Sequence, residues 1–236
     1  MTFRDSLAGS QIIDGNILTA ADINDTFYPL FIGSQSFLFD DFYYPSGTSF
    51  GPWVTDGNGS VLPMSGLNTG MLITVGVATS AEAAIGINEI IFQKGSVDII
   101  VDARIRFSGL QVGSENRVVP IMLNDTFDQD STSNAIFIRS HQDTGSMQLV
   151  TSSGGTNTPT DFTTNPSNYT FARYRLQVGS GNEVKAYVDG VLQATNTSNI
   201  PGVPLKLLLN GIDNSANFSV TTISEIDWVR ITVPRS

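Results

Sequence analysis

The segment from Val97 to Phe107 alternates apolar and polar side chains over most of its length. The apolar residues are Val97, Ile99, Val101, Ala103, Ile105 and Phe107, and the charged residues between them are Asp98, Asp102, Arg104 and Arg106. Successive side chains of a β-strand point to opposite faces of the sheet. The alternation therefore predicts a strand with one face in a core and the other in water, as is typical of antiparallel sheets.

The chain after Phe37 continues as short apolar segments separated by Gly, Asn, Ser and Pro. Strands are predicted over residues 71–77, 85–92, 117–123, 135–139, 147–151, 172–178, 184–188, 191–194, 205–209 and 223–233. Asp189-Gly190 favours a two-residue turn, which predicts a tight hairpin over 184–194. The polar stretch between Thr151 and Thr170 predicts a long exposed loop.

The composition also favours strands over helices. Apolar residues make up 40% of the 236 residues and charged residues only 14%, whereas helical bundles are rich in Glu, Lys, Leu and Ala. The 14 Phe, 6 Tyr and 2 Trp provide enough apolar surface for a core. We therefore predict one all-β domain over residues 36–236, an antiparallel β-sandwich, preceded by a separate segment over residues 1–35.

The segment over residues 1–35 predicts a short helical or extended anchor. Thr19 stands at the position of a helix N-cap, and Ile23 and Phe27 lie four residues apart, on one face of the helix that would follow. Ile17 and Leu18 form an apolar pair just before it. Because a helix of about two turns is unstable alone, we expect these four apolar side chains to dock on the body or on a neighbouring chain.

Charge and cysteine content argue against several kinds of partner. Lys and Arg number 12 against 22 Asp and Glu, a net charge of −10, which disfavours binding to nucleic acid or to anionic membranes. The absence of cysteine excludes disulfides and thiolate metal sites. No segment has about 18 unbroken apolar residues, so we expect no membrane insertion. The N-terminus does not match a secretory signal.

Two parts of the chain resemble known families. Residues 173–178 (RYRLQV) and 184–191 (VKAYVDGV) resemble a strand pair found in concanavalin A-like and laminin-G-like jelly rolls, and residues 223–231 (ISEIDWVRI) are similar to the last strand of those sandwiches. Residues 14–24 (DGNILTAADIN) are similar to a short element near the start of many tailed-phage virion proteins, especially tail fibres and head-attached appendages.

These resemblances imply a non-enzymatic phage virion structural protein, either a capsid decoration, a head fibre or a tail appendage. Its N-terminal segment would bind other virion proteins, and its jelly-roll, lectin-like body would contact host-surface glycans. Such a protein is expected to be located in the virion and to form a homo-oligomer. The alternatives are a free carbohydrate-binding module and a glycoside hydrolase.

Glycan binding commonly uses exposed aromatic rings backed by polar side chains. Trp53, Tyr43, Tyr44 and Tyr169 are candidates because turn-forming and polar residues flank them, with packing as the alternative for each. Trp228 lies in an alternating segment, and we expect it to face the core.

The strongest enzymatic hypothesis uses Glu225 and Asp227, which would share one face of a strand. One concanavalin-like hydrolase family carries a third acid two or three residues further on, but here Val229 and Arg230 stand at those positions. The single histidine, His141, lies in a predicted turn without a nucleophile elbow elsewhere in the sequence. We therefore predict no catalytic residues.

No cofactor is predicted, with structural calcium as the alternative. Asp41 and Asp227 are the candidate ligands, because the first and last strands of the sandwich would meet there and calcium prefers oxygen ligands. Ordinary solvated aspartates are the competing interpretation.

Overall fold

The computed structural model describes residues 35–40, 53–57, 60–63, 71–75, 81–92, 98–108, 116–126, 133–140, 146–164, 170–214 and 222–234. The predicted anchor residues Ile17, Leu18, Ile23 and Phe27 lie outside these ranges, as does the predicted N-terminal helix. Among the described residues, no helix is long and apolar enough to cross a membrane.

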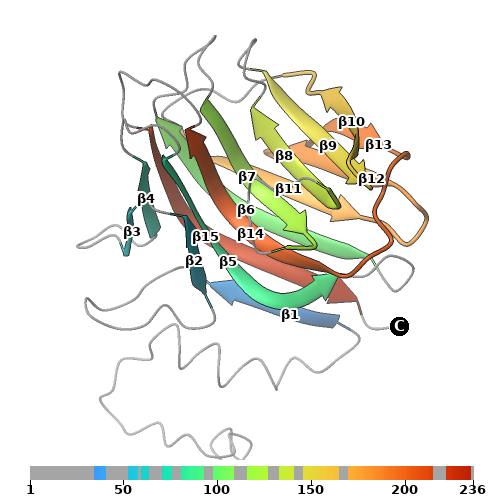
Figure 1. Ribbon diagram of the computed structural model, residues 1–236, viewed down its shortest axis with the longest axis horizontal. Helices are drawn as coiled ribbons and strands as arrows, with labels where there is room; N and C mark the ends of the chain where they lie inside the picture. The colour runs from blue at the N-terminus through green and yellow to red at the C-terminus, as the bar shows by residue number, and fades with distance from the viewer. Residues whose placement is uncertain are drawn as a thin grey trace, which may run out of the picture.

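Two antiparallel sheets pack face to face as a sandwich (Figure 1). The strands of sheet A, in spatial order, are β13 (Val191–Asn196), β12 (Val184–Val188), β11 (Ala172–Val178), β6 (Ile99–Ser108), β15 (Thr222–Pro234), β4 (Met71–Val75) and β3 (Ser60–Pro63), with β1 (Gln35–Asp40) also paired to β15. The strands of sheet B are β10 (Thr156–Asp161), β9 (Met147–Ser153), β8 (Ala135–Ser140), β7 (Asn116–Asn124), β14 (Leu205–Asn214), β5 (Ala81–Phe92) and β2 (Val54–Gly57). The prediction of an all-β sandwich is confirmed.

The first and last described strands are neighbours. Gln35 pairs with Pro234 and Asp40 with Val229, so β1 lies antiparallel along the second half of β15. The first half of β15 pairs with β4 on the same side. On its other side β15 pairs with β6, which in turn pairs with β11. The strands β11, β6 and β15 therefore lie side by side in sheet A.

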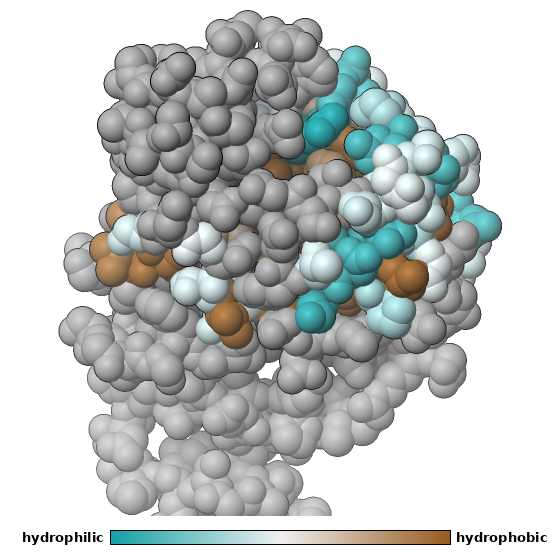
Figure 2. Space-filling model, viewed as in Figure 1, coloured by the Kyte–Doolittle hydropathy of each residue, from teal (hydrophilic) through white to brown (hydrophobic). Residues whose placement is uncertain are grey.

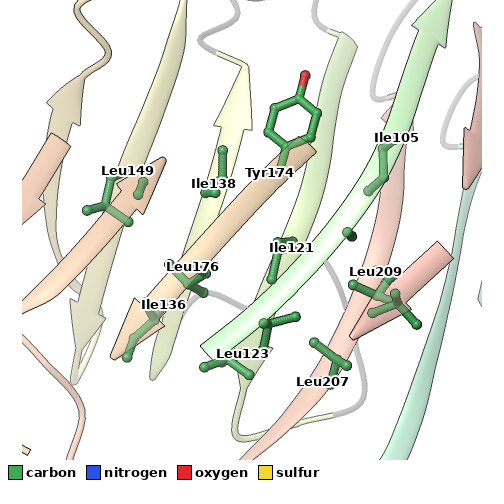
Figure 3. Close-up of a cluster of buried hydrophobic side chains, with 14 of the residues drawn as sticks. Ile105, Ile121, Leu123, Ile136, Ile138, Leu149, Tyr174, Leu176, Leu207 and Leu209 are labelled. Carbon is green, nitrogen blue, oxygen red and sulfur yellow. The ribbon is translucent and has the colours of Figure 1, made fainter. Parts of the chain in front are cut away.

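Alternation in the sequence correctly predicted the faces of β6, and β11 shows the same pattern. In β11 the residues alternate strictly between buried and half-buried, and in β6 Ile99, Val101, Ala103, Ile105 and Phe107 are all buried. Each strand buries one row of side chains between the sheets. The core lies there, and Figure 3 shows Tyr174 and Leu176 of β11 among aliphatic side chains that include Ile121 and Ile138 from sheet B.

The predicted loop between residues 151 and 170 is wrong for its first half. The chain turns at Gly154 and Gly155, which have φ values of 58° and 79°, and returns as β10 along β9. The prediction failed because the sequence of β10, TNTPTD, is polar. It is an edge strand of sheet B, and an edge position tolerates Pro159, whose nitrogen cannot donate to a partner.

The outer face of sheet B is also apolar and buried. A second cluster there consists of Ala84, Val119, Met122, Ala135, Phe137, Val150 and Leu208, each at most 6% exposed. Exposed apolar side chains occur instead at the sheet edges: Val54 on β2, Leu62 on β3, and Val191 and Leu192 on β13. Figure 2 shows hydrophobic surface at the left, where Figure 1 places β3.

The predicted hairpin at Asp189-Gly190 is confirmed and gives a testable prediction. Both residues have positive φ, 49° and 83°, as the favoured two-residue hairpin turn requires. Gly190→Ala is expected to destabilise the fold by about 1–2 kcal/mol, because an L-residue is strained in this conformation. An added Cβ would meet no atom within 4 Å, so the loss would arise from the backbone alone.

Chemical denaturation would measure this loss. Gly202→Ala is the matched control, because a Cβ there also meets nothing within 4 Å and no positive φ applies. The control is expected to change stability by less than about 0.5 kcal/mol. Equal losses in the two variants would show that the turn conformation does not matter.

Candidate ligand-binding face

The structure corrects the prediction that Trp53 is a glycan-stacking residue. Trp53 directly precedes β2 and is only 5% exposed, within the main core cluster. Its polar neighbours in the sequence belong to the edge strand that follows, whereas the ring of Trp53 itself packs in the core. A ring packed in the core cannot stack on a sugar. The other three candidates, Tyr43, Tyr44 and Tyr169, lie outside the described residues.

The outer face of sheet A carries most of the charged side chains that the structure brings together. Five of the chain's 12 Lys and Arg lie there on three neighbouring strands: Arg104, Arg106, Arg173, Arg175 and Arg230. The inward-facing rows of β6, β11 and β15 fill the core, so the alternate rows must point outward. This face points away from the viewer in Figure 1, where sheet A lies behind sheet B.

Asp102 is the centre of this face. Its side chain is 0% exposed although it points away from the core. Arg175 on β11 and Arg230 on β15 are its direct partners across the two strand pairs. Arg175 binds it through two bonds, Nε to Oδ1 at 2.8 Å and Nη2 to Oδ2 at 3.2 Å, and Arg230 donates from Nη2 to Oδ2 at 2.7 Å.

A third arginine completes the cluster. Arg173 donates from Nε to Oδ1 of Asp102 at 3.0 Å, and its Nη2 lies 2.9 Å from the same oxygen. Three guanidinium groups thus share one carboxylate, which leaves an excess of two positive charges. We call Asp102, Arg173, Arg175 and Arg230 the arginine cluster.

The arginines determine the ionisation of Asp102. Burial by itself would raise the pKa of this carboxyl, but hydrogen bonds from Arg175 and Arg230 and the charges of Arg175 and Arg173 outweigh that effect. The pKa of Asp102 is therefore below its ordinary value. Asp102 is thus an ionised carboxylate that holds the three guanidiniums in place. An ionised carboxylate cannot act as a proton donor.

Glu225 and Asp227 share one face, as predicted, and this face points outward, but each is held by an arginine. Glu225 forms an ion pair with Arg106, its direct partner on β6, and Asp227 forms one with Arg104. Both guanidiniums also lie over the ring of Phe171, each 4.7 Å from its centroid. The carboxylates predicted as candidates for hydrolysis or metal binding are thus part of an ion-paired array.

The prediction that Trp228 faces the core is wrong. The pairing of β15 with β6 shifts between Ile226 and Trp228, so that Asp227 is an extra residue in the strand. Because of this β-bulge, Ile226 and Val229 both face the core, whereas Trp228 is half-buried on the outer face. The guanidinium of Arg173 lies 5.9 Å from the Trp228 ring. An aromatic ring therefore lies beside the arginine cluster.

The described residues do not provide a set of ligands for the calcium ion considered above. The first and last strands meet as predicted, but Asp227 pairs with Arg104, and Asp41 lies outside the described ranges. Within those ranges no group of three or more Asp, Glu, His or Cys is placed to hold a metal ion.

The sequence patterns did not identify Arg173, Arg175 and Arg230 as site residues. The available signal was the alternation in 172–178 and in 97–107, which places Arg173, Arg175 and Asp102 on solvent-facing rows. It could not show that β6 lies between β11 and β15. That order, which depends on long-range pairing, gives Asp102 an arginine on each side.

Comparisons with known proteins identify the fold. No family model and no curated protein matches the sequence. Among solved structures, a β-glucanase of Bacillus licheniformis is similar with a TM-score of 0.59 at 15% identity, over 87% of this chain and 100% of that one. An endo-1,3-β-glucanase from Streptomyces sioyaensis is similar with a TM-score of 0.60 at 14% identity, over 86% and 98%.

A carbohydrate recognition domain, that of Emp46p in its metal-free form, is also similar. Its TM-score is 0.59 at 11% identity, over 81% of this chain and 94% of that domain. Two glucanases and a carbohydrate recognition domain thus share this architecture, and at such low identity the likeness shows the fold alone. The chain has a concanavalin A-like jelly-roll fold.

Proposed function

We propose that this chain is a non-enzymatic virion structural protein with a lectin-like body that binds carbohydrate. The observation that carries the binding role is the ion-paired outer face of sheet A, where Glu225, Asp227 and Asp102 are all engaged by arginines. The fold is one on which both glycan recognition and glycan hydrolysis occur. The choice between these functions therefore depends on the chemistry of the side chains.

Hydrolysis requires two carboxyl groups beside the scissile bond, one to donate a proton and one to act as nucleophile or base. Glu225 and Asp227 each commit an oxygen to a guanidinium, and Asp102 is buried and ionised. The position two residues after Asp227 is Val229, which is buried in the core. This arrangement supports recognition of a polar ligand and offers no acid and nucleophile pair.

A turnover assay tests the absence of hydrolysis. The purified protein is expected to bind oligosaccharides on a glycan array. It is also expected to release no reducing ends from soluble β-glucans during prolonged incubation. Glu225→Gln is the informative variant, because it removes the acid and keeps the shape of the side chain. Release of reducing ends by the wild type and its loss in Glu225→Gln would instead identify a glycoside hydrolase.

The virion role rests on residues 14–24, which resemble a phage virion element. In this proposal residues 1–35 bind other virion proteins and support a homo-oligomer. Deletion of Met1 to Gly33 retains β1, which begins at Gln35, so the body is expected to fold. Light scattering is expected to show a trimer or larger assembly for the full chain and a smaller particle for the truncated one. An equal monomeric mass for both would favour a free carbohydrate-binding module.

A further inference from the structure

We infer that the arginine cluster and Trp228 form a binding site for an acidic sugar, one that carries a carboxylate or a phosphate. This inference rests on the proposed lectin function and specifies its class of ligand. The charge distribution supports this class of ligand: the chain has a net charge of −10, yet three guanidiniums converge on one carboxylate on the outside of sheet A.

The cluster has positive charge available for a ligand. Asp102 neutralises only one of its three arginines, and the side chains of Arg173, Arg175 and Arg230 remain 36%, 30% and 42% exposed. Nε of Arg230 is buried and has no hydrogen-bond partner in the described part of the chain. The excess charge on this face is thus both fixed in place and accessible to a ligand.

The geometry suits an anion with two or three oxygens. A guanidinium presents its donors in a planar fork that matches carboxylate and phosphate oxygens. Asp102 and the strand pairing hold the three forks close together, so little conformational entropy would be lost when a ligand binds. The stacking of Arg173 near Trp228 and of Arg175 near Tyr187, both at 5.9 Å, restricts them further.

Trp228 gives the site its preference for a sugar over a bare anion. Its half-buried ring lies on the same face as the arginines because of the bulge at Asp227. Sugar rings pack their apolar C–H faces on aromatic side chains while their polar groups reach hydrogen-bonding residues nearby. The centre of the outer face of sheet B is buried and apolar, so sheet A offers the more suitable surface.

Isothermal titration with full-length protein tests the site, with tri-galacturonate, its methyl ester and mannose 6-phosphate as probes. The ester keeps the sugar and removes the charge. We expect the acidic sugars to bind at least tenfold more tightly than the ester, with affinity falling as salt is added. The relative affinities of tri-galacturonate and mannose 6-phosphate would show whether the site prefers a carboxylate or a phosphate. Inorganic phosphate is expected to bind more weakly than either.

Arg173→Gln and Arg230→Gln are expected to reduce acidic-sugar affinity at least tenfold each. Two arginines would still neutralise Asp102 in either variant, and thermal unfolding would check the fold. Lys206→Gln removes the same charge from β14 of sheet B and is expected to leave affinity within twofold. Trp228→Ala should weaken the binding of acidic sugars and leave that of inorganic phosphate unchanged.

Several outcomes would overturn the inference. If tri-galacturonate and its methyl ester bind with equal affinity, and Arg173→Gln does not change that affinity, the protein is a lectin that does not use the arginine cluster. Inorganic phosphate bound as tightly as the sugars would indicate a simple anion site. Binding of neither acidic sugar would reject the site, and a glycan array negative for every sugar would reject the proposed lectin function too. Self-association lost in Arg230→Gln would assign this face to contact with a second copy.

Discussion

Replacing Asp102 by Asn is expected to destabilise the protein by about 3 kcal/mol, the lower end of the range for breaking a buried ion pair. The carboxylate is fully buried and shared by Arg173, Arg175 and Arg230. Without its charge these guanidiniums would repel one another at close range. Their partial exposure moderates the loss, because water can still screen them. Urea denaturation would measure the change in the free energy of unfolding.

Glu183→Gln is the matched control for Asp102→Asn. Glu183 pairs with Lys185 on the surface and its side chain is 44% exposed, so its loss is expected to cost less than about 0.5 kcal/mol. A cost for Asp102→Asn as small as that of the control would contradict the role of Asp102 as the organising charge of this face.

The lowered pKa of Asp102 also predicts that the stability of the fold depends on pH. The pKa of Asp102 is lower in the folded protein than the ordinary value of 3.8. Its stabilising contribution is therefore fully present above about pH 4 and is lost as the pH falls through the lower folded pKa. Between pH 5 and 2 the wild type is expected to lose more stability than Asp102→Asn, which lacks this titration. Parallel pH curves for the two proteins would contradict the assignment.

Truncation of Tyr174 to Ala is expected to cost about 4 kcal/mol, as is typical of a buried aromatic residue. Tyr174 is 2% exposed, packs at the centre of β11, and makes an edge contact with Phe107 at a centroid distance of 6.0 Å. Figure 3 shows it among side chains from both sheets. Burial raises the pKa of Tyr174 and the charge of Asp189 raises it further, so the phenol stays neutral in the core.

Tyr174→Phe is the control for this truncation, because it keeps the ring and its contact with Phe107. It is expected to cost under about 1.5 kcal/mol. Calorimetric or denaturant unfolding of both variants would separate the volume of the ring from its hydroxyl. Equal losses in Tyr174→Ala and Tyr174→Phe would show that the hydroxyl, and not ring packing, stabilises this part of the core.

The fold was predictable because its signals are local. Alternation in 97–107 correctly assigned inner and outer rows, and Asp189-Gly190 correctly marked a hairpin. The strand β10 was missed because a polar edge strand has the composition of a loop. For Trp53 the sequence left sugar stacking and core packing open, because polar neighbours in sequence do not show where a ring packs.

The sequence by itself determined the fold class, the face that β6 buries and the acidic net charge, because each of these depends on composition or on the two-residue period of the backbone. Only the tertiary structure decided which charges meet. Arg173 and Arg230 reach Asp102 across 71 and 128 residues of chain, through a strand order that local patterns do not encode. A single bulge at Asp227 moved Trp228 to the outer face. Long-range pairing and register therefore built the arginine cluster.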